Sequence, residues 1–147
     1  MNPRADGARG VQEFFAAVRS GDRKAFEAAV DRPALHADLR GQLADVGRQY
    51  GLEVEGGASE FSLDRLITPQ AFVLVDAKTG QPLTGPPSLA QIANSLKISD
   101  RGHVCLMTTT TRSCVLRFTR HGGVWRLTGM PARQTPIALP HYPRDRT

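Results

Sequence analysis

Long hydrophobic runs are missing from this chain of 147 residues. No apolar segment approaches the length of a membrane span or of a signal-peptide core, so we expect neither in the chain as given. Aromatic residues are also few, at 6%, which leaves little on which nucleic-acid bases could stack. Hydrophobic residues at 40% and charged residues at 22% nevertheless indicate a globular domain rather than a disordered segment.

Acidic residues are scarce in the last third of the chain. Residues 101–147 hold eight arginines and a single acid, Asp145, whereas the first 100 residues hold 11 bases and 13 acids. A basic half can indicate binding to nucleic acid or to an anionic surface. Because 16 of the 19 basic residues are arginine, a general preference for arginine on a solvated sheet face is the simpler interpretation, and nucleic acid is not favoured as a partner.

Cysteine is limited to two residues, and a predicted antiparallel meander over Val104–Met130 brings them together. Two-residue turns at Thr109-Thr110 and Gly122-Gly123 would connect its three strands. The first turn places Cys105 directly opposite Cys114, at a separation that a disulfide tolerates. A cross-strand disulfide in an oxidising compartment and two buried free thiols both remain open interpretations.

The same register sorts the side chains of the meander between two faces. It places Leu116 opposite His103, Phe118 opposite Leu127, and Trp125 opposite Arg120. One face then carries the apolar set Cys105, Met107, Cys114, Leu116, Phe118, Trp125 and Leu127. The other face carries Arg117, Thr119, Arg126 and Thr128. Because the apolar set includes no acid, no base and no nucleophile with a partner, this register argues against catalysis inside the sheet.

Helical periodicity dominates the first half of the chain. A first helix carries Val11, Phe14, Phe15 and Val18 at helical spacing and breaks at Gly21-Asp22. A second helix is expected over Arg23–Val30. A third begins after the cap residue Asp31, with Pro33 in its first turn, and ends at Gly51. We expect the third helix to bury one continuous stripe: Leu35, Leu39, Leu43, Val46 and Tyr50.

The middle of the chain is less regular. A short helix is expected over Ser59–Ile67, and Thr68-Pro69 favours another helix over residues 70–77, although 72–75 alone could form a strand. Residues 80–87 form a linker, and Ser88 opens a helix through Leu96. We therefore predict an α+β fold of N-terminal helices packed on a three-stranded meander. Residues 1–10 would be a flexible arm, 11–131 a single domain, and 132–147 a proline-rich tail.

Three short motifs give the chain a family resemblance. They are Gly21-Asp22 at a helix end, Val-Asp-x-Pro-x-Leu over 30–35, and Trp-x-Leu-Thr over 125–128. In this order they resemble a bacterial domain family of unknown function (family 2939), within the broad nuclear-transport-factor-like (NTF2-like) and cystatin-like class. That class includes enzymes, ligand binders and non-catalytic assembly modules. The resemblance implies no catalytic residues, and it implies a membrane anchor or signal that this chain does not show.

Few residues have a spacing that indicates chemistry. The four histidines do not pair at helical or strand spacing, and no phosphate-binding loop or nucleophile elbow is present, so no metal and no cofactor is expected. An NTF2-like enzyme would need a pocket acid, for which the candidate pocket residues are Asp31, Tyr50, Asp64 and Asp76. A partner or anion could instead contact Arg117, Arg120, Trp125 and Arg126.

These observations favour a non-catalytic module that binds a protein or a small ligand. The two alternatives are an isomerase- or hydrolase-like enzyme with a pocket carboxylate, and an anion-binding module on the basic sheet face. Arg120 beside Trp125 could form a cation–π pair, which is open to two interpretations. One is a contact site for an anion or a peptide, and the other is an arginine that covers the edge of the tryptophan ring. A homodimer is compatible with the sequence. We expect a soluble chain, periplasmic or envelope-associated if it is a trimmed form of a longer protein.

Overall fold

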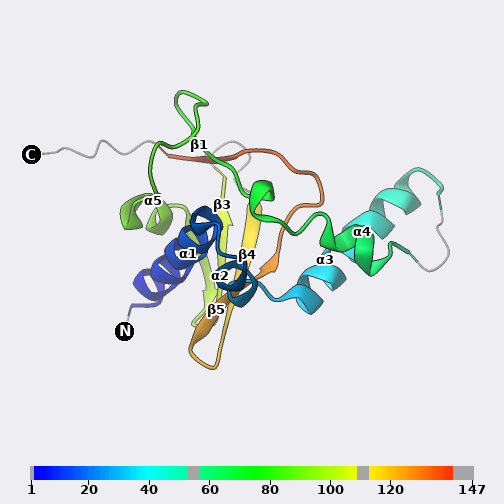
Figure 1. Ribbon diagram of the computed structural model, residues 1–147, viewed down its shortest axis with the longest axis horizontal. Coiled ribbons are helices and arrows are strands. Elements are labelled where there is room, and N and C mark those ends of the chain that lie inside the picture. The colour runs from blue at the N-terminus through cyan, green and yellow to red at the C-terminus, as the bar shows by residue number, and fades with distance from the viewer. Residues whose placement is uncertain (1, 53–56, 109–112, 141–147) are drawn as a thin grey trace, which may run out of the picture.

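The computed structural model describes residues 2–52, 57–108 and 113–140, in a mixed α+β arrangement (Figure 1). Its helices are α1 (Pro3–Ser20), α2 (Arg23–Ala28), α3 (Arg32–Gln49), α4 (Glu60–Asp64), the 3-10 turn η1 (Pro69–Ala71) and α5 (Leu89–Ala93). Its strands are β1 (Leu74–Asp76), β2 (Leu96–Asp100), β3 (His103–Met107), β4 (Cys114–His121), β5 (Val124–Gly129) and β6 (Ile137–Leu139). No helix within these described ranges is both long and apolar enough to cross a membrane.

The main sheet has four antiparallel strands in the order β2-β3-β4-β5, one more than the predicted meander. Strands β1 and β6 form a separate parallel pair, with Leu74 opposite Ile137. The extra strand β2 begins at Leu96, where the sequence predicted the end of a helix. The α+β class is therefore confirmed, and the predicted strand number is wrong.

The β4–β5 hairpin has the predicted register. Phe118 is opposite Leu127, and Arg120 is opposite Trp125. The two residues of the turn, Gly122 and Gly123, have φ angles of 58° and 79°. Two consecutive positive φ angles match the tight turns that suit the twist of a hairpin, and glycine adopts them without strain.

The β3–β4 hairpin has a different register from the one predicted. Leu106 is opposite Leu116, and Met107 is opposite Cys114, with an irregularity between these two pairs. The expected turn at Thr109-Thr110 lies outside the described residues, but a two-residue turn at that position would pair Cys105 with Cys114, which the observed register does not. Cys105 is consequently opposite Arg117 rather than Cys114.

The new register moves the cysteines off the core face. Side chains alternate along β3 and β4, so the buried residues Val104, Leu106, Leu116, Phe118 and Leu127 share one face. Cys105 and Arg117 point to the opposite face, which we call the outer face of the sheet. The predicted placement of Cys105 and Cys114 in the core was wrong, because it depended on the assumed two-residue turn.

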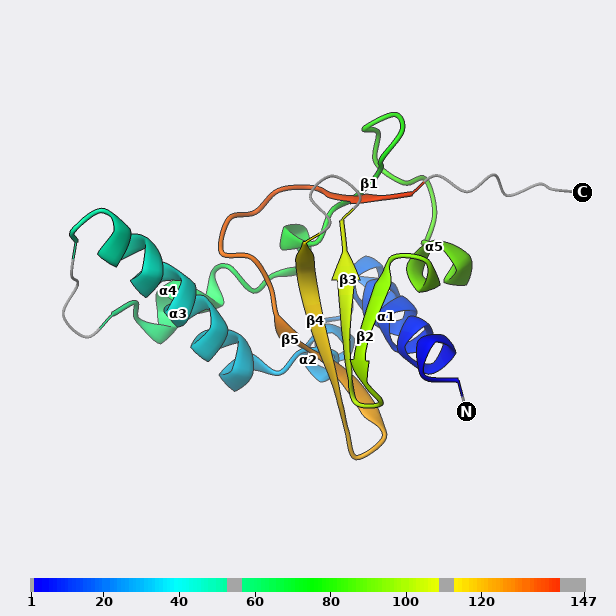
Figure 2. The ribbon, with the colours of Figure 1, turned by 180° about the vertical axis from the view of Figure 1, so that it is seen from behind.

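Helix α1 covers the core face of the sheet (Figures 1 and 2). The ring of Phe14 in this helix packs against two other rings. Its centroid lies 5.3 Å from that of Phe118 in β4 and 5.0 Å from that of Phe72. The helix approaches closely because Gly10 has no side chain: a Cβ there would lie 2.4 Å from the ring of Trp125. Residues 3–10 thus belong to a packed helix, and the predicted flexible arm is wrong for them.

Two other segments differ from the sequence-based prediction. Residues 70–77 do not form a helix, since η1 ends at Ala71 and β1 follows. Strand β1 pairs with β6, so residues 137–139 of the expected mobile tail are packed, with Ile137 and Leu139 buried. Pairing between segments about sixty residues apart has no local sequence signal. Residues 141–147 of the expected tail lie outside the described ranges.

The predicted helix breaks are confirmed. Gly21 ends α1 in the left-handed conformation, and the Asp22 side chain accepts hydrogen bonds from the first turn of α2. Asp31 caps α3 by accepting from the backbone N–H of Ala34. Its own backbone N–H donates to the carbonyl of Leu127, which ties the start of α3 to β5.

Helix α3 buries only its first half. Leu35 and Leu39 are fully buried, whereas Leu43, Val46 and Tyr50 of the same stripe are exposed. The second half of α3 and α4 extend away from the sheet (Figure 1). The prediction that the whole stripe is buried is therefore wrong beyond Leu39.

Candidate functional site

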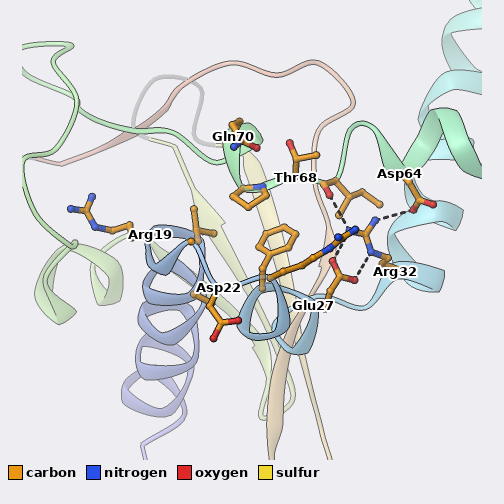
Figure 3. Close-up of a pocket in the computed structure, with 14 residues that line it drawn as sticks. Arg19, Asp22, Glu27, Arg32, Asp64, Thr68 and Gln70 are labelled. Atoms are coloured by element: carbon orange, nitrogen blue, oxygen red, sulfur yellow. Dashed lines mark hydrogen bonds and ion pairs between the residues drawn. The ribbon is translucent and has the colours of Figure 1, made fainter.

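A groove of about 720 Å³ lies between the end of α1, α2, the start of α3 and the segment from α4 to η1 (Figure 3). Phe26 and Ile67 contribute apolar surface to it. Six charged residues also line the groove: Arg19, Asp22, Arg23, Glu27, Arg32 and Asp64. Three are basic and three acidic, so the lining has no net preference for a charged ligand.

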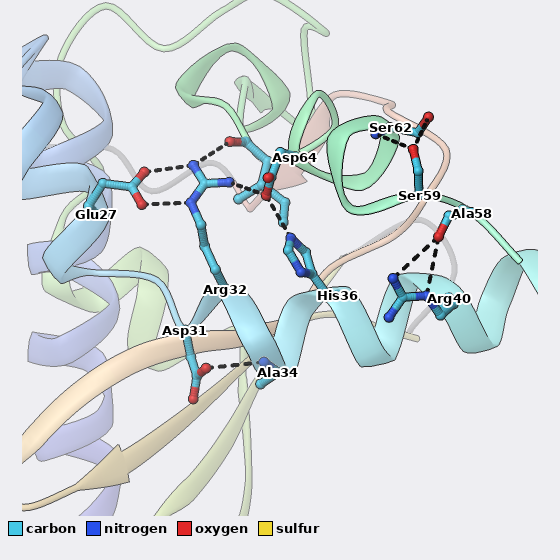
Figure 4. A network of polar contacts seen from close by, with 11 residues as sticks. Glu27, Asp31, Arg32, Ala34, His36, Arg40, Ala58, Ser59, Ser62 and Asp64 are labelled. Carbon is cyan, nitrogen blue, oxygen red and sulfur yellow. Dashed lines mark hydrogen bonds and ion pairs between the residues drawn. The ribbon is translucent and has the colours of Figure 1, made fainter. Parts of the chain in front are cut away.

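The best-defined polar feature of the groove is centred on Arg32 (Figure 4). Its guanidinium donates two hydrogen bonds of 2.6 Å to the carboxylate of Glu27, from Nε to Oε1 and from Nη2 to Oε2. Nη1 donates to Oδ1 of Asp64 at 2.9 Å, and Nη2 also donates to the carbonyl of Ile67 at 3.2 Å. Arg32 therefore joins α2 and α3 to α4 and the residues that follow it.

His36 completes this group, which we call the Arg32 cluster: Glu27, Arg32, His36 and Asp64. Nε2 of His36 lies 2.6 Å from Oδ1 of Asp64, one helical turn along α3 from Arg32. The hydrogen bond with His36, followed by that from Arg32, lowers the pKa of Asp64 below its ordinary value. The hydrogen bond from Arg32 likewise lowers the pKa of Glu27, and that to Glu27 raises the pKa of Arg32.

This arrangement stabilises charges rather than preparing them to react. A general acid near neutral pH needs a carboxyl group with a raised pKa, usually in an apolar site. Both carboxylates of the Arg32 cluster are held in the ionised form by hydrogen-bond donors. The cluster therefore acts as a clamp between helices.

The four candidate pocket residues do not come together. Asp64 lines the groove, whereas Asp31 serves as the α3 cap. Asp76 accepts hydrogen bonds from the backbone N–H groups of Lys78 and Thr79 in the turn after β1. The ring of Tyr50, expected to pack at the end of a buried stripe, is exposed.

The four candidate anion contacts do not form one site, although Arg120 and Trp125 are neighbours, and each has a partner within the chain. Nη1 of Arg120 and Nε1 of Trp125 both donate to Oδ2 of Asp6 in α1, at 2.9 Å and 3.3 Å. This shared carboxylate replaces the cation–π contact considered from the sequence. Arg117 donates to Asp38 at 3.3 Å. Arg126 donates to the carbonyl of Ala28 at 3.3 Å.

The two cysteines form a disulfide, with Cα atoms 5.6 Å apart. They line a second hollow of about 540 Å³ on the outer face of the sheet, together with Lys97, Arg117 and Thr119 among others. We call this the outer hollow. The disulfide was one of the two interpretations left open by the sequence, although it forms across a different register.

An exposed apolar surface is the feature that the sequence analysis missed. The arm, by which we mean residues 43–52 together with α4, carries large apolar side chains with these exposed fractions: Leu43 40%, Val46 51%, Tyr50 73%, Leu52 65% and Phe61 73%. The length of the apolar stripe on α3 was a sign of this exposure. The stripe spans about 23 Å of helix from Leu35 to Tyr50, whereas a five-residue strand spans only about 17 Å. The stripe is therefore longer than the strands against which it could pack.

Within the described ranges, no group of three or more His, Cys, Asp or Glu side chains is placed to hold a metal ion. Comparison with known proteins adds no relative: no family model, no curated protein and no solved structure matches this chain.

Proposed function

We propose that this chain is a non-catalytic protein-binding module and that the arm is its docking surface. The observation that carries the proposal is the exposure of Leu43, Val46, Tyr50, Leu52 and Phe61 on neighbouring parts of one projection. Scattered exposed apolar residues are ordinary on a protein surface, but several gathered on one projecting element are typical of an interaction site.

The arm continues the apolar face of α3, whose first half packs against the core. Leu35 and Leu39 pack into the core, and the next residues of the same stripe have no such cover. Leu43, Val46 and Tyr50 are three and four residues apart, so they form one narrow apolar stripe along α3. Such a stripe suits an amphipathic helix of a partner that packs along α3 with its apolar side chains against the stripe. A partner in this position would extend the hydrophobic core of the module.

The contacts of the groove support a non-catalytic role. Asp64, the one candidate acid that lines it, is held by His36 and Arg32, and its pKa is lowered. The arginine contacts likewise weaken the anion-binding alternative, since Arg117, Arg120 and Arg126 each donate to an oxygen of the chain itself. Membership of the bacterial family and an envelope location stay predictions.

Site-specific photo-cross-linking tests the docking surface. A benzoylphenylalanine introduced at Val46 should form a discrete adduct in cells, and the same probe at Val124 of the β4–β5 hairpin should not. Val124 is the matched control because it is similarly exposed, at 44%, and lies away from the arm. The change Leu43→Asp should remove the adduct at Val46.

The identity of the adduct decides between partners. An adduct of twice the chain mass makes a second copy the partner; any other mass identifies a different protein, which must then bind the purified module. A second probe at Tyr50 should also form an adduct. An absence of adducts at both Val46 and Tyr50, or equal amounts of adduct at Val46 and Val124, would contradict the proposal.

A further inference from the structure

The Cys105–Cys114 disulfide is on the solvent side of the sheet. Cys105 lies between the core residues Val104 and Leu106, so the alternation of β3 directs it to the outer face. Both cysteines line the outer hollow.

The two cysteine residues differ in exposure. Cys114 is an exposed residue at the first position of β4, whereas Cys105 has only 6% of its surface exposed. Thiol–disulfide exchange begins when a thiolate attacks one sulfur of a disulfide, and the rate depends on access to that sulfur. An incoming thiolate therefore reaches Cys114, and Cys105 is the sulfur that leaves.

Two basic residues are the cross-strand neighbours of Cys105: Lys97 of β2 and Arg117 of β4, and both line the outer hollow. Directly opposed residues have Cβ atoms about 4.5–5.5 Å apart, so the side chain of Lys97 starts beside that of Cys105. The stem of Arg117 lies instead against Gly129 of β5, and its guanidinium contacts Asp38 of α3. Nearby cations favour a thiolate, and a more stable leaving thiolate departs faster.

Two acidic residues, Asp38 and Asp100, lie near these basic residues, and each has a contact of its own. Arg117 also contacts Asp38 of α3 at 3.3 Å, but its side chain remains 62% exposed. The carboxylate of Asp100 lies 2.8 Å from Nδ1 of His103, so it is already occupied by a neighbour. Lys97 and Arg117 are the cations nearest to Cys105 by register.

From this arrangement we infer that Cys105–Cys114 is a thiol–disulfide exchange site that accepts two electrons from a dithiol reductant. One thiolate of the dithiol attacks Sγ of Cys114, the Cys105–Cys114 bond breaks, and its electron pair leaves on Cys105 as a thiolate next to its cross-strand neighbour Lys97. The second sulfur of the dithiol, once deprotonated, attacks the mixed disulfide and releases the thiolate of Cys114. Both cysteines take up the two protons that the dithiol lost, and the dithiol becomes a disulfide.

The test is the rate at which dithiothreitol reduces the folded protein, followed by acid quenching, alkylation and mass measurement. We expect a rate that rises linearly with dithiothreitol concentration without urea. Lys97→Met should slow reduction about threefold, the change expected when the pKa of a leaving thiol rises by about one unit. Lys97→Arg should restore the rate.

Arg126→Met is the matched control, because Arg126 is on the outer face of β5 and is not a cross-strand neighbour of Cys105. Its rate should equal that of the unchanged protein. Urea unfolding of each oxidised variant checks that slower reduction does not reflect altered stability. A rate independent of dithiothreitol concentration, set by global unfolding, would overturn the inference. So would equal rates in Lys97→Met and Arg126→Met. Neither outcome would bear on the arm.

Discussion

Replacing Arg32 by methionine should destabilise the fold more than removing any surface arginine. The variant keeps most of the apolar stem but loses the hydrogen bonds to Glu27, Asp64 and the carbonyl of Ile67. Charge-assisted hydrogen bonds contribute about 1.5–3 kcal/mol each when well formed. The partner carboxylates are 41% and 45% exposed, so solvent screening reduces that contribution. We expect a loss of about 2 kcal/mol in the free energy of unfolding.

Urea unfolding followed by the fluorescence of Trp125, the sole tryptophan, measures this loss. The control is Arg48→Met, which removes an ion pair to Asp45 whose side chains are 65% and 72% exposed. Such pairs contribute less than about 1 kcal/mol. Equal losses in Arg32→Met and Arg48→Met would refute the view that the Arg32 cluster clamps the helices.

The pH dependence of stability provides a second measurement on the same cluster. The pKa values of Glu27 and Asp64 are lowered in the folded state, so as the pH falls the unfolded chain takes up protons first. Their contribution is therefore present above about pH 5 and is lost as the pH falls through the lower, folded pKa values. Arg32→Met should lose less stability than the unchanged protein between about pH 6 and about pH 3. Parallel pH profiles would contradict this.

Three further substitutions test the packing of the helices. Gly10→Ala should destabilise by about 1–3 kcal/mol in thermal unfolding, because its Cβ would lie 2.4 Å from the Trp125 ring; a stabilised variant would show that α1 is not so close. Gly41→Ala, with nothing within 4 Å of the added Cβ, should instead stabilise by up to about 1 kcal/mol. Asp31→Ala should cost about 1 kcal/mol through loss of the α3 cap, and an unchanged midpoint would argue against that cap.

Local signals in the sequence predicted local structure well. Gly122-Gly123 gave the β4–β5 register correctly, and Asp22 and Asp31 cap the helices as expected. The β3–β4 register could not be predicted in the same way, because the strands pair with an irregularity between Leu106 and Met107 that has no signal in the sequence.

Features that depend on distant segments were the ones missed. The Thr68-Pro69 signal favours a helix over residues 70–77, whereas residues 74–76 form a strand whose pairing partner lies at 137–139. Arg32 and Asp64 are also far apart in sequence and meet only because α4 returns to the start of α3. Periodicity predicted which face of α3 is apolar, but whether a residue such as Val46 is covered depends on what packs there.

The most direct measurement of the docking surface is the affinity of the module for the partner identified by cross-linking at Val46. Isothermal titration should show at least tenfold weaker binding for Val46→Asp, which corresponds to about 1.4 kcal/mol. Because Val46 is 51% exposed, this change should leave the unfolding midpoint near that of the unchanged protein. Val124→Asp should bind as tightly as the unchanged module. Equal affinities for Val46→Asp and the unchanged module would contradict the assignment of the arm as the binding surface.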